Sequence, residues 1–212
     1  MNPMPPGVMH DPAVQQHAID AEDALRASTY SLLAALLAAP PSRELLELVA
    51  GIGDNGNGSG NGMAQAWKVL GLAGRCTSVE SLDDEYHALF IGLARGELVP
   101  YGSWYLTGFL MDRPLAQLRS DLAALGFERT EGVHEPEDHA AALCETMGLI
   151  IAAGQEFGHE VQRSFFAKHL EPWMGQFFTD LANAEAACFY RAVGHLGQQF
   201  VDLERQYFSM PA

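Results

Sequence analysis

Apolar residues recur every three or four positions along most of the chain after Asp20, which places them on one face of a helix. No segment alternates apolar and polar residues over the length of a strand. The brief runs Leu98-Val99 and Trp104-Tyr105 are interrupted by proline and glycine. The pattern therefore predicts an all-α protein, a compact bundle of about eight or nine helices of ordinary length.

Proline, glycine and short polar side chains mark where these helices begin and end. Pro40-Pro41 ends the first apolar stripe. Thr77 and Glu80 have the spacing of a capping box, in which the hydroxyl and the carboxylate satisfy each other's backbone donors at a helix start. Pro136 suits the first turn of a helix that continues through Ile151, because that position needs no backbone N–H.

The chain reads as one all-helical domain, residues 20–212, after a mobile tail of residues 1–19 that is rich in proline and polar residues. Residues 51–62 hold six glycines in twelve positions and predict a flexible loop rather than a phosphate-binding one, since GxxxxGK[ST] is absent. A polar connection offers a hinge near residues 127–137. Exchange of helices at that hinge would give a domain-swapped dimer, so monomer and swapped dimer both stay open.

Charge narrows the class of partner. Twelve basic and 27 acidic residues give a net charge of 12 − 27 = −15, with hydrophobic residues at 48%. That apolar content is ample for a core, whereas the acidic surface repels free nucleic acid, so we expect no nucleic-acid partner. Such a surface instead suits basic peptides.

Cysteine usage and the first residues bear on the compartment. The three cysteines, Cys76, Cys144 and Cys188, are widely spaced and form no CxxC pair, which is typical of a reducing cytosol. The chain starts without a basic and then apolar leader, and its longest apolar run, Leu32 to Ala39, is far shorter than the roughly 20 residues of a membrane span. We expect a cytoplasmic protein that is not integral to the membrane.

The segment His134-Glu-Pro-Glu-Asp-His139 combines possible metal ligands with good helix-start chemistry. A zincin needs two histidines four residues apart on one helix; here they are five apart with Pro136 between them. One alternative is a small metal-dependent hydrolase built on His134, Asp138 and His139. The other is that Glu137 and Asp138 simply favour the positive end of a helix dipole.

Aromatic side chains gather in a second region. Tyr86, Leu89 and Phe90 share one helical face, and the connector from Pro100 to Tyr105 contains two tyrosines, a tryptophan and a serine. Aromatic rings with polar ends suit a partly wet groove that buries apolar side chains of a partner. The alternative is a turn that closes the end of the bundle.

Three motifs occur together in a definite order: Tyr86xxLeu89-Phe90, then Pro100-Tyr101-x-Ser103, then Glu135-Pro136-x-Asp138-His139. In this order and spacing the chain resembles the TorD/DmsD/NarJ family of cytoplasmic redox-enzyme maturation chaperones, from about Ser78 to Gly154. The resemblance implies an all-helical chaperone that is not an enzyme. We expect no cofactor, while binding of a nucleotide or of the molybdenum cofactor itself stays open as an alternative. Such a protein binds the twin-arginine signal peptide and apo form of a molybdoenzyme and delays its export until the cofactor is inserted.

The family's peptide-binding residues carry over only by position in these motifs, and tyrosine replaces tryptophan of several relatives at Tyr86 and Tyr101. The clients consistent with the resemblance are DMSO or TMAO reductases, formate dehydrogenases and nitrate reductases. The expected signal-peptide site consists of Tyr86, Leu89, Phe90, Pro100, Tyr101, Ser103, Trp104, Glu137, Asp138 and His139.

Overall fold

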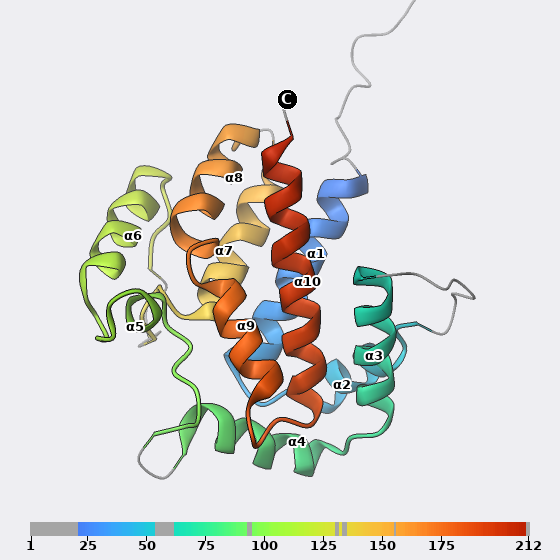
Figure 1. The fold of residues 1–212 in the computed structure, drawn as a ribbon. Helices are drawn as coiled ribbons and strands as arrows, with labels where there is room; N and C mark the ends of the chain where they lie inside the picture. Colours follow the sequence, from blue (N-terminus) through green and yellow to red (C-terminus); the bar gives the residue numbers. More distant parts are fainter. Residues whose placement is uncertain are drawn as a thin grey trace, which may run out of the picture.

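The computed structural model describes residues 21–53, 62–92, 95–129, 132, 135–154 and 156–210. Over these residues the chain forms ten α-helices and no strand, which confirms the predicted all-α class (Figure 1). The predicted tail 1–19, most of the glycine-rich loop and part of the hinge segment lie outside the described residues. The number of helices exceeds the expected eight or nine because the connector after Tyr101 contains a short helix of its own.

The helices follow the chain in a simple order, with two of them continuing into a π-helical turn (η2 after α4, η3 after α8). Their bounds are α1 Ala21–Ala38, α2 Arg43–Ala50, α3 Met63–Arg75, α4 Val79–Tyr86, η2 His87–Ile91, α5 Gly102–Thr107, α6 Arg113–Ala124, α7 Ala140–Ala152, α8 His159–Phe165, η3 Phe166–Leu170, α9 Met174–Asn183 and α10 Phe189–Ser209.

Four close helix pairings hold the body of the bundle together. Helix α1 packs along α7, α10 packs along α9, and α3 packs against both α10 and α2. Figure 1 shows α5 and α6 on one side of this body, α2 and α3 on the other, and α4 crossing its lower end. Buried leucines and aromatic rings from most of these elements form one continuous core.

Helix α10 approaches α9 closely because glycine stands at their contact. A Cβ atom on Gly197 would lie 2.2 Å from the ring of Phe178, and one on Gly194 would lie 2.6 Å from the backbone nitrogen of Ala182. Neither position therefore has space for a side chain. These glycines set how closely the two C-terminal helices pack.

A carboxylate from α4 caps the start of α10. Glu85 accepts the backbone N–H groups of Cys188, Phe189 and Tyr190 at 2.7, 3.0 and 2.7 Å. A negative charge is favourable at this end of a helix because unpaired N–H groups and the positive end of the dipole meet there. Glu85 thus fixes α4 and the adjoining η2 turn against the C-terminal half of the chain.

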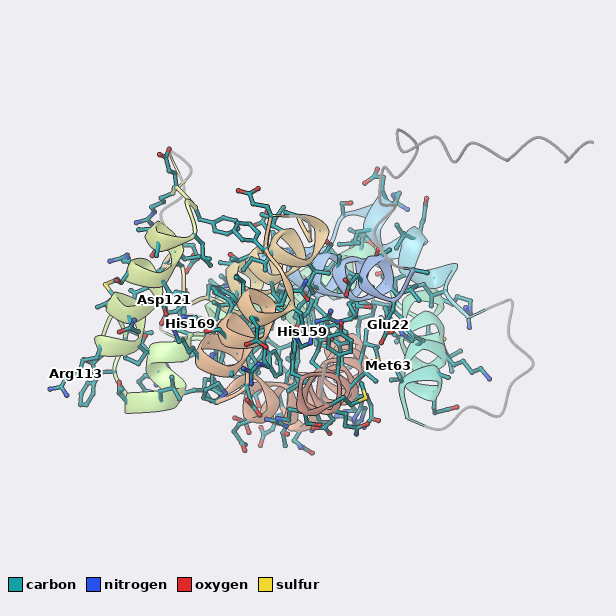
Figure 2. The ribbon with its side chains drawn as sticks, turned by 90° about the horizontal axis from the view of Figure 1, so that it is seen from above. Glu22, Met63, Arg113, Asp121, His159 and His169 are labelled. Carbon is teal, nitrogen blue, oxygen red and sulfur yellow. The ribbon has the colours of Figure 1, made fainter. Side chains whose placement is uncertain are left out.

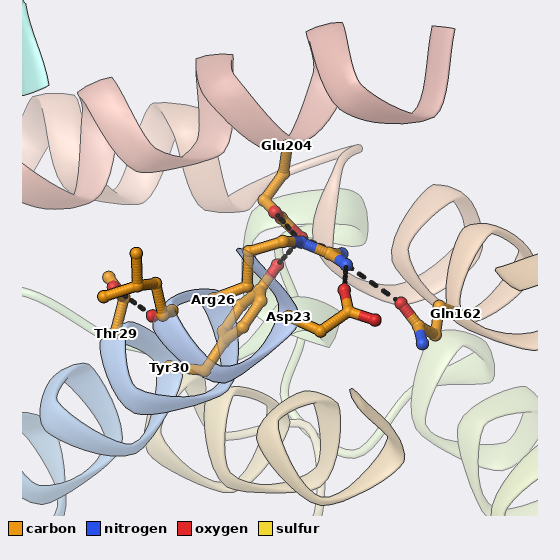
Figure 3. A network of polar contacts seen from close by, with 7 residues as sticks. Asp23, Arg26, Thr29, Tyr30, Gln162 and Glu204 are labelled. Carbon is orange, nitrogen blue, oxygen red and sulfur yellow. Dashed lines mark hydrogen bonds and ion pairs between the residues drawn. The ribbon is translucent and has the colours of Figure 1, made fainter. Parts of the chain in front are cut away.

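Figure 3 shows a buried ion pair that joins the first helix to the last. The guanidinium of Arg26 donates to both carboxylate oxygens of Glu204, at 2.6 and 2.8 Å. It also donates to Asp23 and to Gln162 of α8, and Tyr30 donates to Glu204. Arg26 is 4% exposed and Glu204 is fully buried, so each charge depends on these partners.

Two helix starts differ from those expected. Ser78 rather than Thr77 caps α4, because its hydroxyl accepts the backbone N–H of Ser81, whereas the Thr77 hydroxyl donates back to Ala73. Helix α7 begins at Ala140 instead of at Pro136. The reason is tertiary: residues before Ala140 pair with another segment of the chain.

Candidate functional site

The motif that begins at Pro100 and the motif that begins at Glu135 lie next to each other in the fold. Tyr101 and His139 form an isolated antiparallel β-bridge. Beside it the Gly102 N–H donates to the Asp138 carbonyl at 2.9 Å, and the Ala140 N–H donates to the Pro100 carbonyl at 2.8 Å. The bridge holds residues 138 and 139 in extended pairing, which is why α7 starts only after them.

Asp138 fastens the beginning of α5. Its Oδ2 accepts the backbone N–H of Ser103 at 2.8 Å, which satisfies a donor at the start of this short helix. Asp138 is 3% exposed and Ser103 is fully buried. The two residues therefore hold the connector in place from inside the protein.

His139 caps α7 and carries the ring that faces Tyr101. Its Nδ1 accepts the backbone N–H of Ala141 at 3.1 Å. The rings of Tyr101 and His139 meet edge to face with centroids 5.1 Å apart. The hydroxyl of Tyr101 donates to Glu135, so an exposed carboxylate and a partly exposed phenol lie beside the imidazole of His139, which is 7% exposed.

The first motif supplies an aromatic cluster at the end of α4. The ring of Tyr86 lies 5.0 Å from that of Phe90 and 6.1 Å from that of Tyr190 on α10. The Tyr86 hydroxyl donates to the carbonyl of Leu37 near the end of α1. This bond joins the cluster to the first helix.

These features border a long groove of about 1370 Å³. Its lining includes Tyr86, Phe90, Pro100, Tyr101 and His139 at the aromatic end, and continues over α1, α7, α2 and Trp67. Sites for drug-sized molecules usually measure about 300–1,000 Å³, so this groove has the size for a peptide. Among the described residues that line it, the carboxylates are Glu135 and Glu145, and none is lysine or arginine.

The other five expected site residues lie away from the groove. Leu89, Ser103 and Asp138 are buried beneath it. Trp104 is half-buried under the guanidinium of Arg95, 5.0 Å from its ring centre. Glu137 pairs with Arg119 at 2.8 Å and with Arg129 at 3.7 Å, so its charge is already compensated.

Burial shifts the titration of the groove residues. It raises the pKa of Tyr86 to about 12, and it raises that of Tyr101 further, with help from the hydrogen bond to Glu135. Burial lowers the pKa of His139, although Glu135 and Asp138 partly oppose this effect. At neutral pH the aromatic end thus presents neutral rings and a carboxylate.

The alternative metal site gains no support from this geometry. His134 lies outside the described residues. Asp138 and His139 are neighbours in the chain, yet one accepts from Ser103 and the other from Ala141, each in a structural role. Within the part of the chain that the structure describes, no three His, Cys, Asp or Glu side chains gather as metal ligands.

A smaller cavity of about 450 Å³ lies on the other side of the connector and is lined by Asp138, Trp173 and His169 among others. Figure 2 shows His169 beside Asp121 of α6, and their closest nitrogen–oxygen distance is 2.9 Å. Lys168 contacts the same carboxylate at 3.5 Å. These pairs hold α6 against η3. Asp138 lines this smaller cavity, whereas its neighbour His139 lines the groove.

Sequence reasoning missed the part of the groove formed by α1 and α2. Leu25, Leu48, Ile91 and Leu149 all line it and are 52–70% exposed. Their signal in the sequence was an outward helix face without charge: after Asp23, the exposed positions of α1 carry only alanine, serine and leucine. The two carboxylates in the lining, Glu135 and Glu145, were not among the predicted site residues, which included Glu137 and Asp138 instead.

Fold and site together define an all-α bundle with an open, acid-lined apolar groove. A family model described as nitrate reductase delta subunit matches residues 58–179, more than half of the chain. The chain belongs to this family. The predicted membership of the TorD/DmsD/NarJ family is therefore confirmed. Among the described residues no helix is both long and apolar enough to cross a membrane.

Curated relatives point to the same family. Chaperone protein TorD of Vibrio cholerae serotype O1 is 27% identical over 126 residues, which cover 55% of this chain and 57% of that protein. The chain thus spans little more than half the length of this relative. Chaperone protein TorD of Vibrio parahaemolyticus is 24% identical over 176 residues, covering 78% of this chain and 82% of that protein.

A solved structure shares the fold. The crystal structure of a redox enzyme maturation protein from Archaeoglobus fulgidus superposes with a TM-score of 0.55 over 84% of this chain and 94% of that one. The sequences are 15% identical over the match, so the likeness concerns the helical arrangement alone.

Proposed function

We propose that this protein is a cytoplasmic maturation chaperone that binds the twin-arginine signal peptide and the apo body of a molybdoenzyme precursor, and delays export until the cofactor is inserted. It acts by binding and has no catalytic residue. The client is a redox enzyme of the DMSO or TMAO reductase, formate dehydrogenase or nitrate reductase type.

The groove is the observation that carries this proposal. A twin-arginine signal has basic residues followed by an apolar stretch, and the groove offers carboxylates and aromatic faces beside apolar walls. A guanidinium over the rings of Tyr101 or Phe90 gains cation–π attraction, and Glu135 supplies the opposite charge. The −15 net charge draws a basic segment toward the protein before contact.

Within the proposed site the residues have two roles. Phe90 and Tyr101 are partly exposed in the groove and contact the peptide, whereas Tyr86, Pro100 and His139 line the groove but are themselves largely buried. The buried residues Leu89, Ser103 and Asp138 position those side chains. Trp104 and Glu137 lie away from the groove and are partly exposed, and we assign them to contact with the body of the precursor.

Titration calorimetry with a synthetic signal peptide tests the proposal. We expect a dissociation constant of about 1 μM, since ordering costs offset much of the apolar gain. A matched peptide with both arginines replaced by glutamine should bind at least about tenfold more weakly. Equal affinity for the two peptides would contradict a twin-arginine site, and co-purification of a precursor from the native host identifies the client.

A further inference from the structure

The connection between α5 and α6 carries a compact group of exposed apolar side chains. Among the described residues eleven large apolar side chains are exposed; four of them line the groove and three are scattered over α3 and the end of α10. The other four lie within six consecutive residues and are here called the apolar tip: Leu106, Phe109, Leu110 and Met111, which are 43, 71, 51 and 74% exposed. A contiguous exposed group of this kind indicates a surface that a partner covers.

The backbone of the apolar tip is held in a defined conformation. Gly108 ends α5 in the left-handed region, with φ of 80°. The hydroxyl of Thr107 donates to the carbonyl of Ser103 at 2.9 Å and accepts the N–H of Phe109 at 3.3 Å. Met111 also has a positive φ, 57°, which costs free energy in a residue with a Cβ atom and is typical of binding segments. The fold thus presents these side chains on a preorganised turn.

The charges near the apolar tip differ from those of the groove. Within residues 106–124 the charged side chains classed as exposed are Arg113 and Arg119, although the chain carries a net charge of −15. Arg119 is paired with Glu137, and Asp112 lies at the N-cap of α6, where the helix dipole favours its charge. Figure 2 shows Arg113 at the outer edge of the molecule. An apolar surface with acidic groups fits the tip, whereas the groove fits a basic segment.

The apolar tip and the aromatic end of the groove lie at the two ends of one short helix. Tyr101 is the N-cap of α5 and Gly108 is its C-cap. The six residues between them span about 9 Å. The bond from the Ser103 N–H to Asp138 fastens this helix to the rest of the protein. One ligand molecule is therefore able to contact both places at once.

We propose that the apolar tip binds an apolar, acid-edged surface on the body of the precursor whose signal peptide occupies the groove. This inference rests on the proposed function and adds to it the surface that holds the body. An enzyme without its cofactor leaves the apolar walls of the cofactor site uncovered, and such walls match the tip in chemistry. An anionic bilayer fits less well, because the net charge of −15 repels it.

The covalent link between signal peptide and body strengthens the complex. Once the signal peptide is bound, the body is confined close to the apolar tip, so its effective concentration there is high. A weak contact at the tip is then sufficient to hold the body, and it is lost when the two parts are separated.

Two matched variants test the apolar tip. Leu110→Ser removes an apolar side chain that is 51% exposed at the tip, whereas Leu72→Ser makes the same change on α3, at a position that is 56% exposed and outside the groove. The probes are the precursor that co-purifies from the native host, prepared without cofactor, the same protein without its signal peptide, and the isolated signal peptide. Calorimetry measures the three affinities, and circular dichroism verifies that each variant is folded.

We expect Leu110→Ser to weaken the binding of the precursor and of its signal-less body about tenfold, and to leave the isolated signal peptide within about twofold of wild type. Leu72→Ser should be neutral for all three probes. Phe109→Ser should repeat the effect of Leu110→Ser, and Arg113→Gln should weaken the body about threefold at low salt. If both tip variants bind the body as tightly as wild type does, or if wild type does not bind the body, the tip assignment is wrong while signal-peptide binding leaves the proposed function standing. If wild type binds neither the signal peptide nor the precursor, the proposed function fails as well.

Other occupants of the apolar tip give different results. A benzophenone side chain in place of Phe109 should label the body of the precursor, and labelling confined to the signal peptide would overturn the proposal. Vesicles of phosphatidylglycerol and phosphatidylcholine should not bind the wild-type protein. Vesicle binding that Leu110→Ser abolishes would assign the tip to a membrane surface, and self-association that Leu110→Ser abolishes in sedimentation velocity would assign it to a second copy of the chain.

Discussion

Tyr101 and His139 belong to separate motifs, yet they pair as a β-bridge and their ring centroids lie 5.1 Å apart. Because the Tyr101 hydroxyl donates to Glu135, the contact places an aromatic face and a carboxylate side by side at one end of the groove.

Removing the Tyr101 ring should weaken peptide binding more than removing its hydroxyl. Tyr101→Ala deletes the aromatic face, so we expect about a tenfold loss of affinity for the twin-arginine peptide. Tyr101→Phe keeps the face and should stay within about threefold of wild type. Calorimetry measures both, and the far-ultraviolet circular dichroism of all three proteins should agree. Equal losses in the two variants would show that the ring itself contributes nothing.

Substituting Glu135 should weaken peptide binding more than substituting Glu137. Glu135 lines the groove, whereas Glu137 is engaged by Arg119 and Arg129. We therefore expect Glu135→Gln to lower the affinity for the peptide about fivefold at low salt. The loss should be smaller at about 0.5 M salt, because salt screens the attraction between the carboxylate and the arginines. Glu137→Gln is the control and should change affinity by less than about twofold. The opposite ranking would place the arginines beside Glu137.

Acid should destabilise the protein partly through His139. Burial holds its pKa below the ordinary 6.5, so the unfolded chain binds a proton more readily than the folded one. The stabilisation is complete above pH 6.5 and is lost as the pH falls through the lower folded pKa. His139→Asn retains a capping acceptor for the Ala141 N–H but does not titrate, so it should lose less stability on acidification.

Urea unfolding at pH 7.5 and at pH 5.5 measures this difference. The decrease in the free energy of unfolding between the two pH values should be smaller for His139→Asn than for wild type. An identical decrease in both proteins would mean that His139 titrates alike in the folded and unfolded states.

Removing one charge of the buried ion pair between α1 and α10 should destabilise the protein more than removing both charges. Glu204→Gln leaves the guanidinium of Arg26 without its carboxylate and should cost about 3–5 kcal/mol of unfolding free energy. The double variant Arg26→Met with Glu204→Leu removes both charges and should recover much of this loss. Thermal unfolding of the three proteins is the measurement. A double variant less stable than Glu204→Gln would contradict the expectation.

Gly197 should not tolerate a methyl group. Gly197→Ala places a Cβ where the ring of Phe178 lies 2.2 Å away, so α9 and α10 must separate, at a cost of about 1–3 kcal/mol. Gly158→Ala is the matched control, because nothing lies within 4 Å of its added Cβ. Chemical unfolding compares the two, and equal stability would show that Phe178 rotates away at little cost.

Local sequence patterns were sufficient to predict the family and most of the helices. The end of the first helix was predicted closely, since Pro40-Pro41 is a stop signal within one segment and α1 ends at Ala38. The start of α7 was wrong by four residues, because Asp138 and His139 pair with Tyr101 and its neighbours instead of joining the helix. No signal inside residues 136–140 reports a partner that far along the chain.

The sequence by itself determined that the chain is helical, acidic and a member of its family, because periodicity, charge and motif order are properties of neighbouring residues. Only the tertiary structure decided which side chains reach the groove. Asp138 and His139 are adjacent in the chain, yet Asp138 turns inward to Ser103 and His139 faces Tyr101. Helix α1 is apolar on two sides, and periodicity does not tell which side meets the protein's own core and which remains open for a partner.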